Sequence, residues 1–78
     1  MKTQMTLLEL SNVLVSRGYP DLFDFDVESD ILDIKNMKGS IADEMGENLV
    51  EFDIIELGDE SYFEHKSHLD TIVSVDLS

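Results

Sequence analysis

The sequence contains no cysteine and few basic residues, and both shortages narrow its possible functions. Without Cys it can form neither a disulfide scaffold nor a Cys-based zinc site. Its 5 Lys and Arg residues stand against 18 Asp and Glu residues, which gives a formal net charge of −13 with both His neutral. A nucleic-acid binder needs a basic surface that displaces counterions from phosphates, so direct binding of nucleic acid is excluded. An anionic membrane surface is an equally poor partner.

The chain also lacks long apolar runs. None approaches the roughly 18 residues of a transmembrane span, and no basic stretch precedes an apolar one as in a secretory leader. We therefore expect a cytoplasmic protein. Its 78 residues suffice for one domain, and we take residues 1–78 as a single acidic domain. Apolar residues make up 42% of the sequence, which is enough for one small core, so we expect the chain to fold despite its charge.

The acidic residues are concentrated after residue 20. Residues 1–20 hold Glu9 against Lys2 and Arg17, a formal charge of +1, whereas residues 21–78 hold 17 acids against three Lys residues, a charge of −14. A small domain needs a net charge of only about 2–8 for solubility, and a larger charge costs stability through self-repulsion. We infer that the acidic surface has a partner rather than serving solubility alone.

The pattern near the N-terminus predicts an amphipathic helix over residues 7–17. Thr6 and Glu9 have the spacing of a capping box, in which each side chain accepts the other residue's backbone N–H. Leucines then recur at helical spacing until Gly18, which is typical of a helix end.

Strands and a short second helix are expected after this helix. Residues 23–34 alternate apolar and acidic side chains, which is typical of a strand with one acidic face. Residues 41–45 predict the short helix, and residues 49–57 are apolar on both faces, as in a central strand. Residues 62–67 and 71–77 are expected to return as antiparallel strands. The predicted fold class is α+β, with an N-terminal amphipathic helix, a short second helix and an antiparallel sheet of four to five strands.

No catalytic or metal-binding pattern is present. The acidic residues that start at Asp24 resemble a calcium-binding EF-hand loop, but its sixth and twelfth positions hold Ser29 and Lys35 in place of Gly and Glu. His65 and His68 are three residues apart, yet nothing around them predicts a metal site, and we expect both to face solvent near a turn. We find neither a nucleophile elbow nor a glycine-rich phosphate loop. We therefore expect no enzyme activity, no cofactor and no metal.

An acidic strand can imitate the DNA backbone. Alternate side chains of a strand lie about 6.6 Å apart, twice its 3.3 Å rise, which is of the same order as the charge spacing along a DNA strand. Ionised carboxylates also accept charge-assisted hydrogen bonds, as phosphate oxygens do. DNA mimicry is therefore the leading functional class on physical grounds. The acids that we assign to the mimic surface are Asp24, Asp26, Glu51, Asp53, Asp59 and Glu60.

The segment Glu28-Ser29-Asp30-Ile31-Leu32 resembles a first-strand segment of the phage uracil-DNA glycosylase inhibitors, a family of small, very acidic DNA mimics. Residues 51–55 and 58–61 are similar to that family's second strand and the turn after it. The resemblance implies a stoichiometric inhibitor that occupies the DNA-binding groove of uracil-DNA glycosylase in a 1:1 complex. It would block uracil base-excision repair in a bacterial host, as evasion of host defence by a phage or mobile element requires.

The resemblance also implies site residues. Those expected to contact the enzyme's groove are Glu28, Ser29, Asp30, Ile31 and Leu32. Those expected to line a pocket for the apolar residue that the enzyme inserts into the DNA minor groove are Ile41, Met45 and Ile54. Two alternatives stay open: a DNA mimic against a restriction or CRISPR nuclease, and an acidic immunity or antitoxin protein that covers a basic partner. The first interpretation requires a concave apolar pocket beside the acidic strand, and the alternatives do not.

Overall fold

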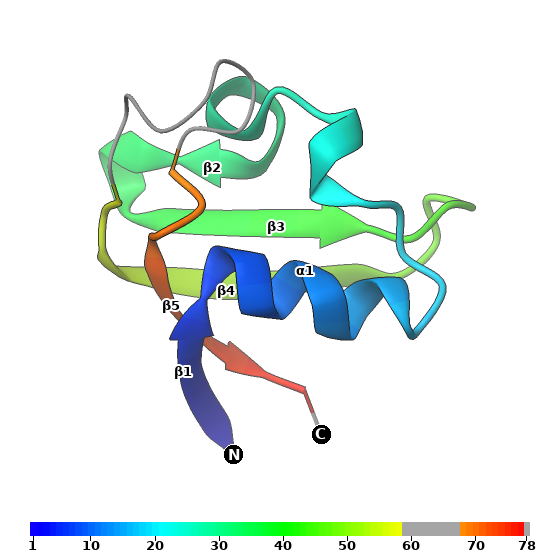
Figure 1. Cartoon of the computed structure of the whole chain (residues 1–78), viewed down its shortest axis with the longest axis horizontal. Coiled ribbons are helices and arrows are strands. Elements are labelled where there is room, and N and C mark those ends of the chain that lie inside the picture. The colour runs from blue at the N-terminus through cyan, green and yellow to red at the C-terminus, as the bar shows by residue number, and fades with distance from the viewer. Residues whose placement is uncertain (59–67, 78) are drawn as a thin grey trace.

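The centre of the molecule is a five-stranded antiparallel sheet (Figure 1). The computed structural model describes residues 1–58 and 68–77. The strands are β1 (Lys2–Thr6), β2 (Leu32–Asp33), β3 (Lys38–Ala42), β4 (Leu49–Glu56) and β5 (Ile72–Asp76). Their order in the sheet is β1-β5-β4-β3-β2, so β4 is the middle strand, as predicted, and β1 and β2 form the edges. With the helix α1 (Leu7–Val15) in front of the sheet, the α+β fold class is confirmed.

The helix α1 begins where the capping box predicts. Thr6 Oγ1 accepts the Glu9 N–H at 3.1 Å, and Glu9 Oε1 accepts the Thr6 N–H at 3.2 Å. These two bonds satisfy amides at the helix start that have no partner within the helix. The helix ends at Val15, two residues before the predicted end, and a turn follows in which Gly18 has a φ of 91°.

The core lies between α1 and one face of the sheet. Leucines of α1 pack there against alternate residues of β4 and β5: Leu7, Leu10, Leu14, Phe52, Ile54, Val73 and Val75. On β3, Gly39 pairs with Phe52, and a Cβ at this position would overlap the Phe52 ring. Because strand side chains alternate between the two faces, the residues that lie between these on β4 and β5 face away from α1, and we call that side of the sheet the open face.

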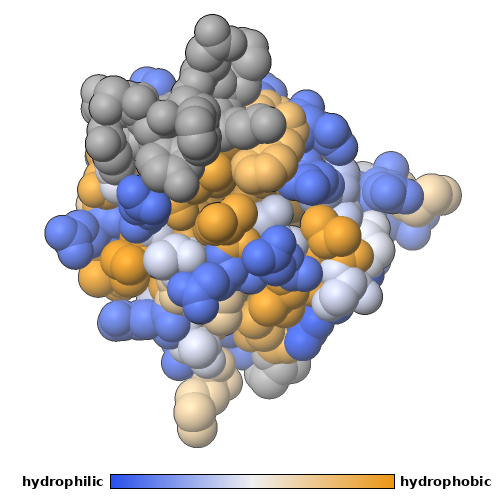
Figure 2. Space-filling view, viewed as in Figure 1, coloured by the Kyte–Doolittle hydropathy of each residue, from blue (hydrophilic) through white to orange (hydrophobic). Residues whose placement is uncertain are grey.

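The side of the molecule that α1 covers has a mixed surface. Figure 2 shows hydrophobic and hydrophilic side chains interspersed over it. The exposed apolar residues here include Leu8 and Val15. Single exposed apolar residues are normal on a protein surface and indicate no site.

The segment between α1 and β2 is not the acidic strand that its alternation predicts. It forms the 3₁₀ turn Leu22–Asp24 and then the π-helical turn Val27–Ile31, here called the π turn. Carboxylates stabilise both turns: Asp21 caps the first, and Asp26 Oδ1 accepts the Ser29 N–H at 3.4 Å in the second. The strand prediction was wrong because these acids bond local amides and favour turns over extended backbone.

The short helix predicted over residues 41–45 was also wrong. This segment contains the end of β3 and the start of a tight turn to β4. Asp43 closes the turn, since its carboxylate accepts the Glu47 N–H at 2.9 Å and Asn48 Nδ2 at 2.6 Å. After α1, the helical elements in the described part of the chain are instead the two turns before β2 and the 3₁₀ turn Ile34–Asn36 after it.

The edge strand β1 was not predicted, because its polar side chains show no apolar alternation. It pairs with β5 along its whole length, from Lys2 with Asp76 to Thr6 with Ile72. The strands β4 and β5 lie within the predicted ranges 49–57 and 71–77. The strand predicted at 62–67 lies outside the described residues. Within the described ranges, no helix is long and apolar enough to cross a membrane.

Candidate partner-binding surface

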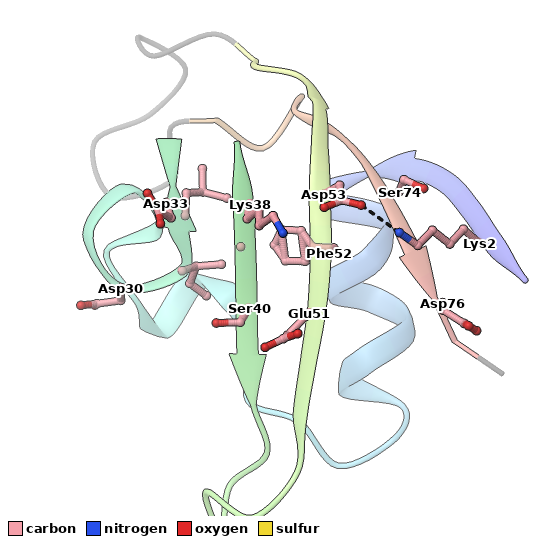
Figure 3. Close-up of a pocket in the computed structure, with 13 residues that line it drawn as sticks. Lys2, Asp30, Asp33, Lys38, Ser40, Glu51, Phe52, Asp53, Ser74 and Asp76 are labelled. Atoms are coloured by element: carbon pink, nitrogen blue, oxygen red, sulfur yellow. Dashed lines mark hydrogen bonds and ion pairs between the residues drawn. The ribbon is translucent and has the colours of Figure 1, made fainter. Parts of the chain in front are cut away.

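A hollow of about 680 Å³ lies on the open face. Figure 3 shows its side chains projecting from the sheet, with α1 on the far side. The charged residues that line it are five acids and two lysines: Asp30, Asp33, Glu51, Asp53, Asp76, Lys2 and Lys38. The formal charge of this lining is therefore −3. We call these residues and the space they enclose the acidic hollow.

Strand register sets the spacing of the charges in the acidic hollow. Asp33 pairs with Lys38, and Lys38 pairs with Asp53, so the three form a row of alternating sign across β2, β3 and β4. Glu51 lies two residues before Asp53 on β4, which separates their positions by about 6.6 Å. The hollow thus holds carboxylates at the spacing that the sequence predicted for a phosphate-like array.

Lys2 partly neutralises one of these carboxylates. Its Nζ reaches across β5 and lies 2.9 Å from Asp53 Oδ2. The hydrogen bond from Lys2 and then the attraction of its charge hold the pKa of Asp53 below its usual value. The same contacts raise the pKa of Lys2. Both groups therefore carry their charges at neutral pH, and this pair ties β1 to β4.

Glu51 has no comparable neutralisation. Its side chain is exposed, and within the described residues this side chain has no hydrogen-bond or ion-pair partner. The register places Asp76 opposite it on β5, since Phe52 pairs with Val75 at the next position along β4. Asp76 Oδ1 also lies 3.4 Å from the N-terminal ammonium. Two carboxylates at directly opposed strand positions destabilise a sheet. A cationic group placed between Glu51 and Asp76 would remove this repulsion.

A second hollow of about 540 Å³ adjoins the first. Its apolar lining comes from the segment before β2, from β3 and from the start of β4: Pro20, Phe25, Ile31, Ile41, Ala42 and Leu49. Its polar lining is Asp30, Ser40, Asp43 and Glu44, so three carboxylates and no basic residue stand beside the apolar surface. We call this second site the apolar groove. Asp30, Ile31 and Ser40 line both hollows and therefore mark their boundary.

The structure brings only part of the predicted groove contact to these hollows. Asp30 and Ile31 line both of them, and Leu32 lines the acidic hollow. Glu28 and Ser29 line neither, because the π turn replaces the predicted strand.

The three residues of the predicted apolar pocket do not meet. Ile41 lines the apolar groove, although it is only 3% exposed. Met45 is 78% exposed on the turn between β3 and β4. Ile54 is buried in the core beneath α1, on the same face of the sheet as Ile41, and lines neither hollow. The helix on which the prediction placed Ile41 and Met45 is replaced by the end of β3 and the turn after it, so the structure does not gather the three residues around one hollow.

The predicted acidic mimic surface is also divided. Glu51 and Asp53 lie in the acidic hollow, whereas Asp24 and Asp26 belong to the turns before β2 and do not line it. The remaining two, Asp59 and Glu60, lie outside the described residues.

Sequence reasoning missed four charged residues of the acidic hollow: Lys2, Asp33, Lys38 and Asp76. A signal for Asp76 was present, since apolar residues alternate with Ser74 and Asp76 in the last predicted strand. Lys2 had no such signal because β1 was not recognised as a strand.

His68 does not face solvent, contrary to the prediction. It is completely buried, has a positive φ of 69°, and neither ring nitrogen has a hydrogen-bond partner in the part of the chain that the structure describes. Its Nε2 lies 3.7 Å from Glu28 Oε2 on the π turn. His65 lies outside the described residues, and among residues 1–58 and 68–77 no three potential metal ligands cluster.

Comparison of the chain with protein-family models, with curated proteins and with solved structures finds no match in any of the three. The function must therefore be argued from the geometry of the two hollows.

Proposed function

We propose that this chain is a non-enzymatic binding protein that occupies the nucleic-acid-binding surface of a basic partner. The observation that carries the proposal is the set of five carboxylates, against two lysines, that line the acidic hollow on the side of the sheet away from α1. Carboxylates accept the same charge-assisted hydrogen bonds from Arg, Lys and backbone amides as phosphate oxygens. A groove that has evolved to hold a phosphate backbone therefore also suits this surface.

The arrangement of the acids supports a binding role over a structural one. The fold does not need the Glu51 carboxylate, since the Glu51 side chain makes no hydrogen bond or ion pair within the described residues and its position lies opposite Asp76. Like charges at opposed strand positions lower the stability of the free protein, and the contact of Asp76 with the N-terminal ammonium at 3.4 Å offsets only part of this repulsion. A partner's cation between the two carboxylates converts that repulsion into attraction and so strengthens binding.

The specific partner that we propose is uracil-DNA glycosylase in the cytoplasm of a bacterial host. The chain would inhibit it in a 1:1 complex and block uracil base-excision repair, in the service of a phage or mobile element. The apolar groove supports this choice over a nuclease or a basic toxin as target, because it lies directly beside the carboxylates. The groove can enclose an apolar side chain of the partner while the neighbouring carboxylates bind basic residues of the partner on either side of it. The contact residues that we now propose are Asp30, Ile31, Ile41, Glu51 and Asp53.

The test is uracil excision from single-stranded uracil-containing DNA by a bacterial uracil-DNA glycosylase, with this protein at equimolar and tenfold ratios. Repetition at high salt separates a specific complex from simple polyanion competition, which fades as charge is screened. We expect complete inhibition near equimolar ratio that persists at high salt. Absence of inhibition in both buffers would rule out this partner. A pull-down with immobilised basic DNA-processing enzymes and toxins would then test the broader proposal.

A further inference from the structure

Among the described residues 1–58 and 68–77, no strand pairs with the outer edge of β1. The Leu7 N–H donates to the Thr71 oxygen at 2.8 Å, at the position that continues the β1–β5 register. Hydrogen-bonded and non-hydrogen-bonded positions alternate along an antiparallel pair. Thr3 and Met5 therefore direct their amides toward β5, whereas Lys2 and Gln4 direct theirs outward, away from the sheet.

The other edge of the sheet is protected against strand addition. β2 contains only two residues, and helical turns lie directly before and after it in the chain. Its Asp33 uses both carboxylate oxygens on Asn36. Short edge strands flanked by irregular backbone are a common protection. By contrast, β1 is five residues long and has no proline or bulge.

The charge distribution indicates what can pair with β1. Residues 1–20 carry a formal charge of +1 in a chain of −13, so the β1 edge is where two copies approach with the least repulsion. We propose that two copies of this chain associate through antiparallel pairing of their β1 strands. This inference is independent of the proposed glycosylase inhibition.

Symmetry fixes the contacts of such a pair. With the two-fold axis at Gln4, the two Gln4 residues exchange N–H to C=O hydrogen bonds, and Lys2 of one copy faces Thr6 of the other. No like charges are then directly opposed. The Thr6 N–H already donates to Glu9, so Lys2 gains one bond, from its own N–H to the Thr6 carbonyl. The two sheets become continuous, and both acidic hollows lie on the same face of the ten-stranded sheet.

The association is expected to be weak and to strengthen with salt. One strand pair buries less than the about 1,200 Å² typical of stable complexes. The acidic parts of the two copies, residues 21–78, repel each other, and salt screens this repulsion. We expect sedimentation equilibrium to show a monomer–dimer equilibrium whose dimer fraction rises between 0.05 and ~0.5 M NaCl.

Two variants test the strand pairing. Gln4→Pro removes an N–H that points away from β5, and Gln4→Lys places two like charges at the two-fold axis. Each is expected to raise the dimer dissociation constant by about tenfold or more. Gln4→Ala keeps the backbone amide and should dimerise like the wild type. Thermal melts by circular dichroism confirm that the variants are folded. A protein that is monomeric at every concentration and salt would overturn the proposal, and so would a dimer that both Gln4→Pro and Gln4→Lys leave intact.

Discussion

At the residue scale, Gly39 shows how a single side chain limits the packing behind the acidic hollow. The Phe52 ring occupies the space beside Gly39, and the Ile31 backbone oxygen lies 3.0 Å from where a Cβ would be. Small-to-large changes in a packed core typically cost about 1–3 kcal/mol. We expect Gly39→Ala to lower the free energy of unfolding by about this amount, as measured by urea denaturation. Ser40→Ala, on the adjacent residue, is the control and should change it by less than about 0.5 kcal/mol. Equal stability of Gly39→Ala and the wild type would contradict this packing.

Asp43 gives a second prediction at this scale. The hydrogen bond from the Asn48 side chain, followed by backbone N–H groups of the turn, lowers the pKa of Asp43 below 3.8. Because the folded-state pKa is the lower one, this contribution to stability is complete above the unfolded pKa and is lost as pH falls through the folded-state pKa.

The direct check is an NMR titration of the Asp43 carboxyl group in the wild type and in Asn48→Ala. We expect the variant's pKa to move upward toward 3.8, since it loses the largest cause of the shift. The stability of the variant should also depend less on pH below about 4. An unchanged pKa in Asn48→Ala would show that the Asn48 side chain does not hold this carboxylate.

At the scale of secondary-structure elements, α1 is the clearest case of local sequence determining structure. Replacing an N-cap threonine by alanine typically costs about 1 kcal/mol. We expect Thr6→Ala to lower the free energy of unfolding by this amount, because the Glu9 N–H loses its acceptor. Thr3→Ala on the same strand makes no such change and serves as the control. If the two variants unfold at the same urea concentration, the capping bonds contribute nothing measurable.

The elements that could be predicted from sequence are those with a strong local signal. The capping box located α1, a segment that is apolar on both faces located β4, and apolar alternation located β5. The strand prediction was wrong for residues 23–31 because their acidic side chains, which alternate as on one face of a strand, cap helical turns instead. Asp26, for example, accepts the Ser29 N–H. β3 was missed because residues 41–45 were assigned to a short helix, although pairing with β4 decides the conformation of this segment. Long-range pairing of this kind leaves no local pattern.

The same reasons explain how much of the candidate site was predictable. Glu51 and Asp53 were found because β4 was correctly identified, and strand alternation then places both on one face. Lys2 lies on the polar edge strand β1, and Asp33 lies on the short edge strand β2. Asp30 lines the hollow because the π turn places it there. The apolar groove joins three separate parts of the chain, so only the folded structure could show it.

At the scale of the whole molecule, the net charge of −13 is the dominant feature. Self-repulsion of this kind destabilises the compact state, and salt screens it, with a Debye length of about 30 Å at 0.01 M and 8 Å at 0.15 M. We expect the melting temperature to rise between these two NaCl concentrations, as measured by differential scanning calorimetry. A melting temperature that falls would mean that favourable ion pairs such as Lys2–Asp53 outweigh the repulsion.

The central claim is that particular carboxylates of the acidic hollow, and not the net charge alone, bind the partner. Glu51→Lys tests it most directly, because removing the repulsion with Asp76 should leave the free protein at least as stable. Glu47→Lys makes the same charge change at an exposed residue that lines neither hollow. The measurement is the concentration of each variant that halves uracil excision by the glycosylase. We predict an increase of about tenfold or more for Glu51→Lys and little change for Glu47→Lys. Equal effects of the two substitutions would contradict the account.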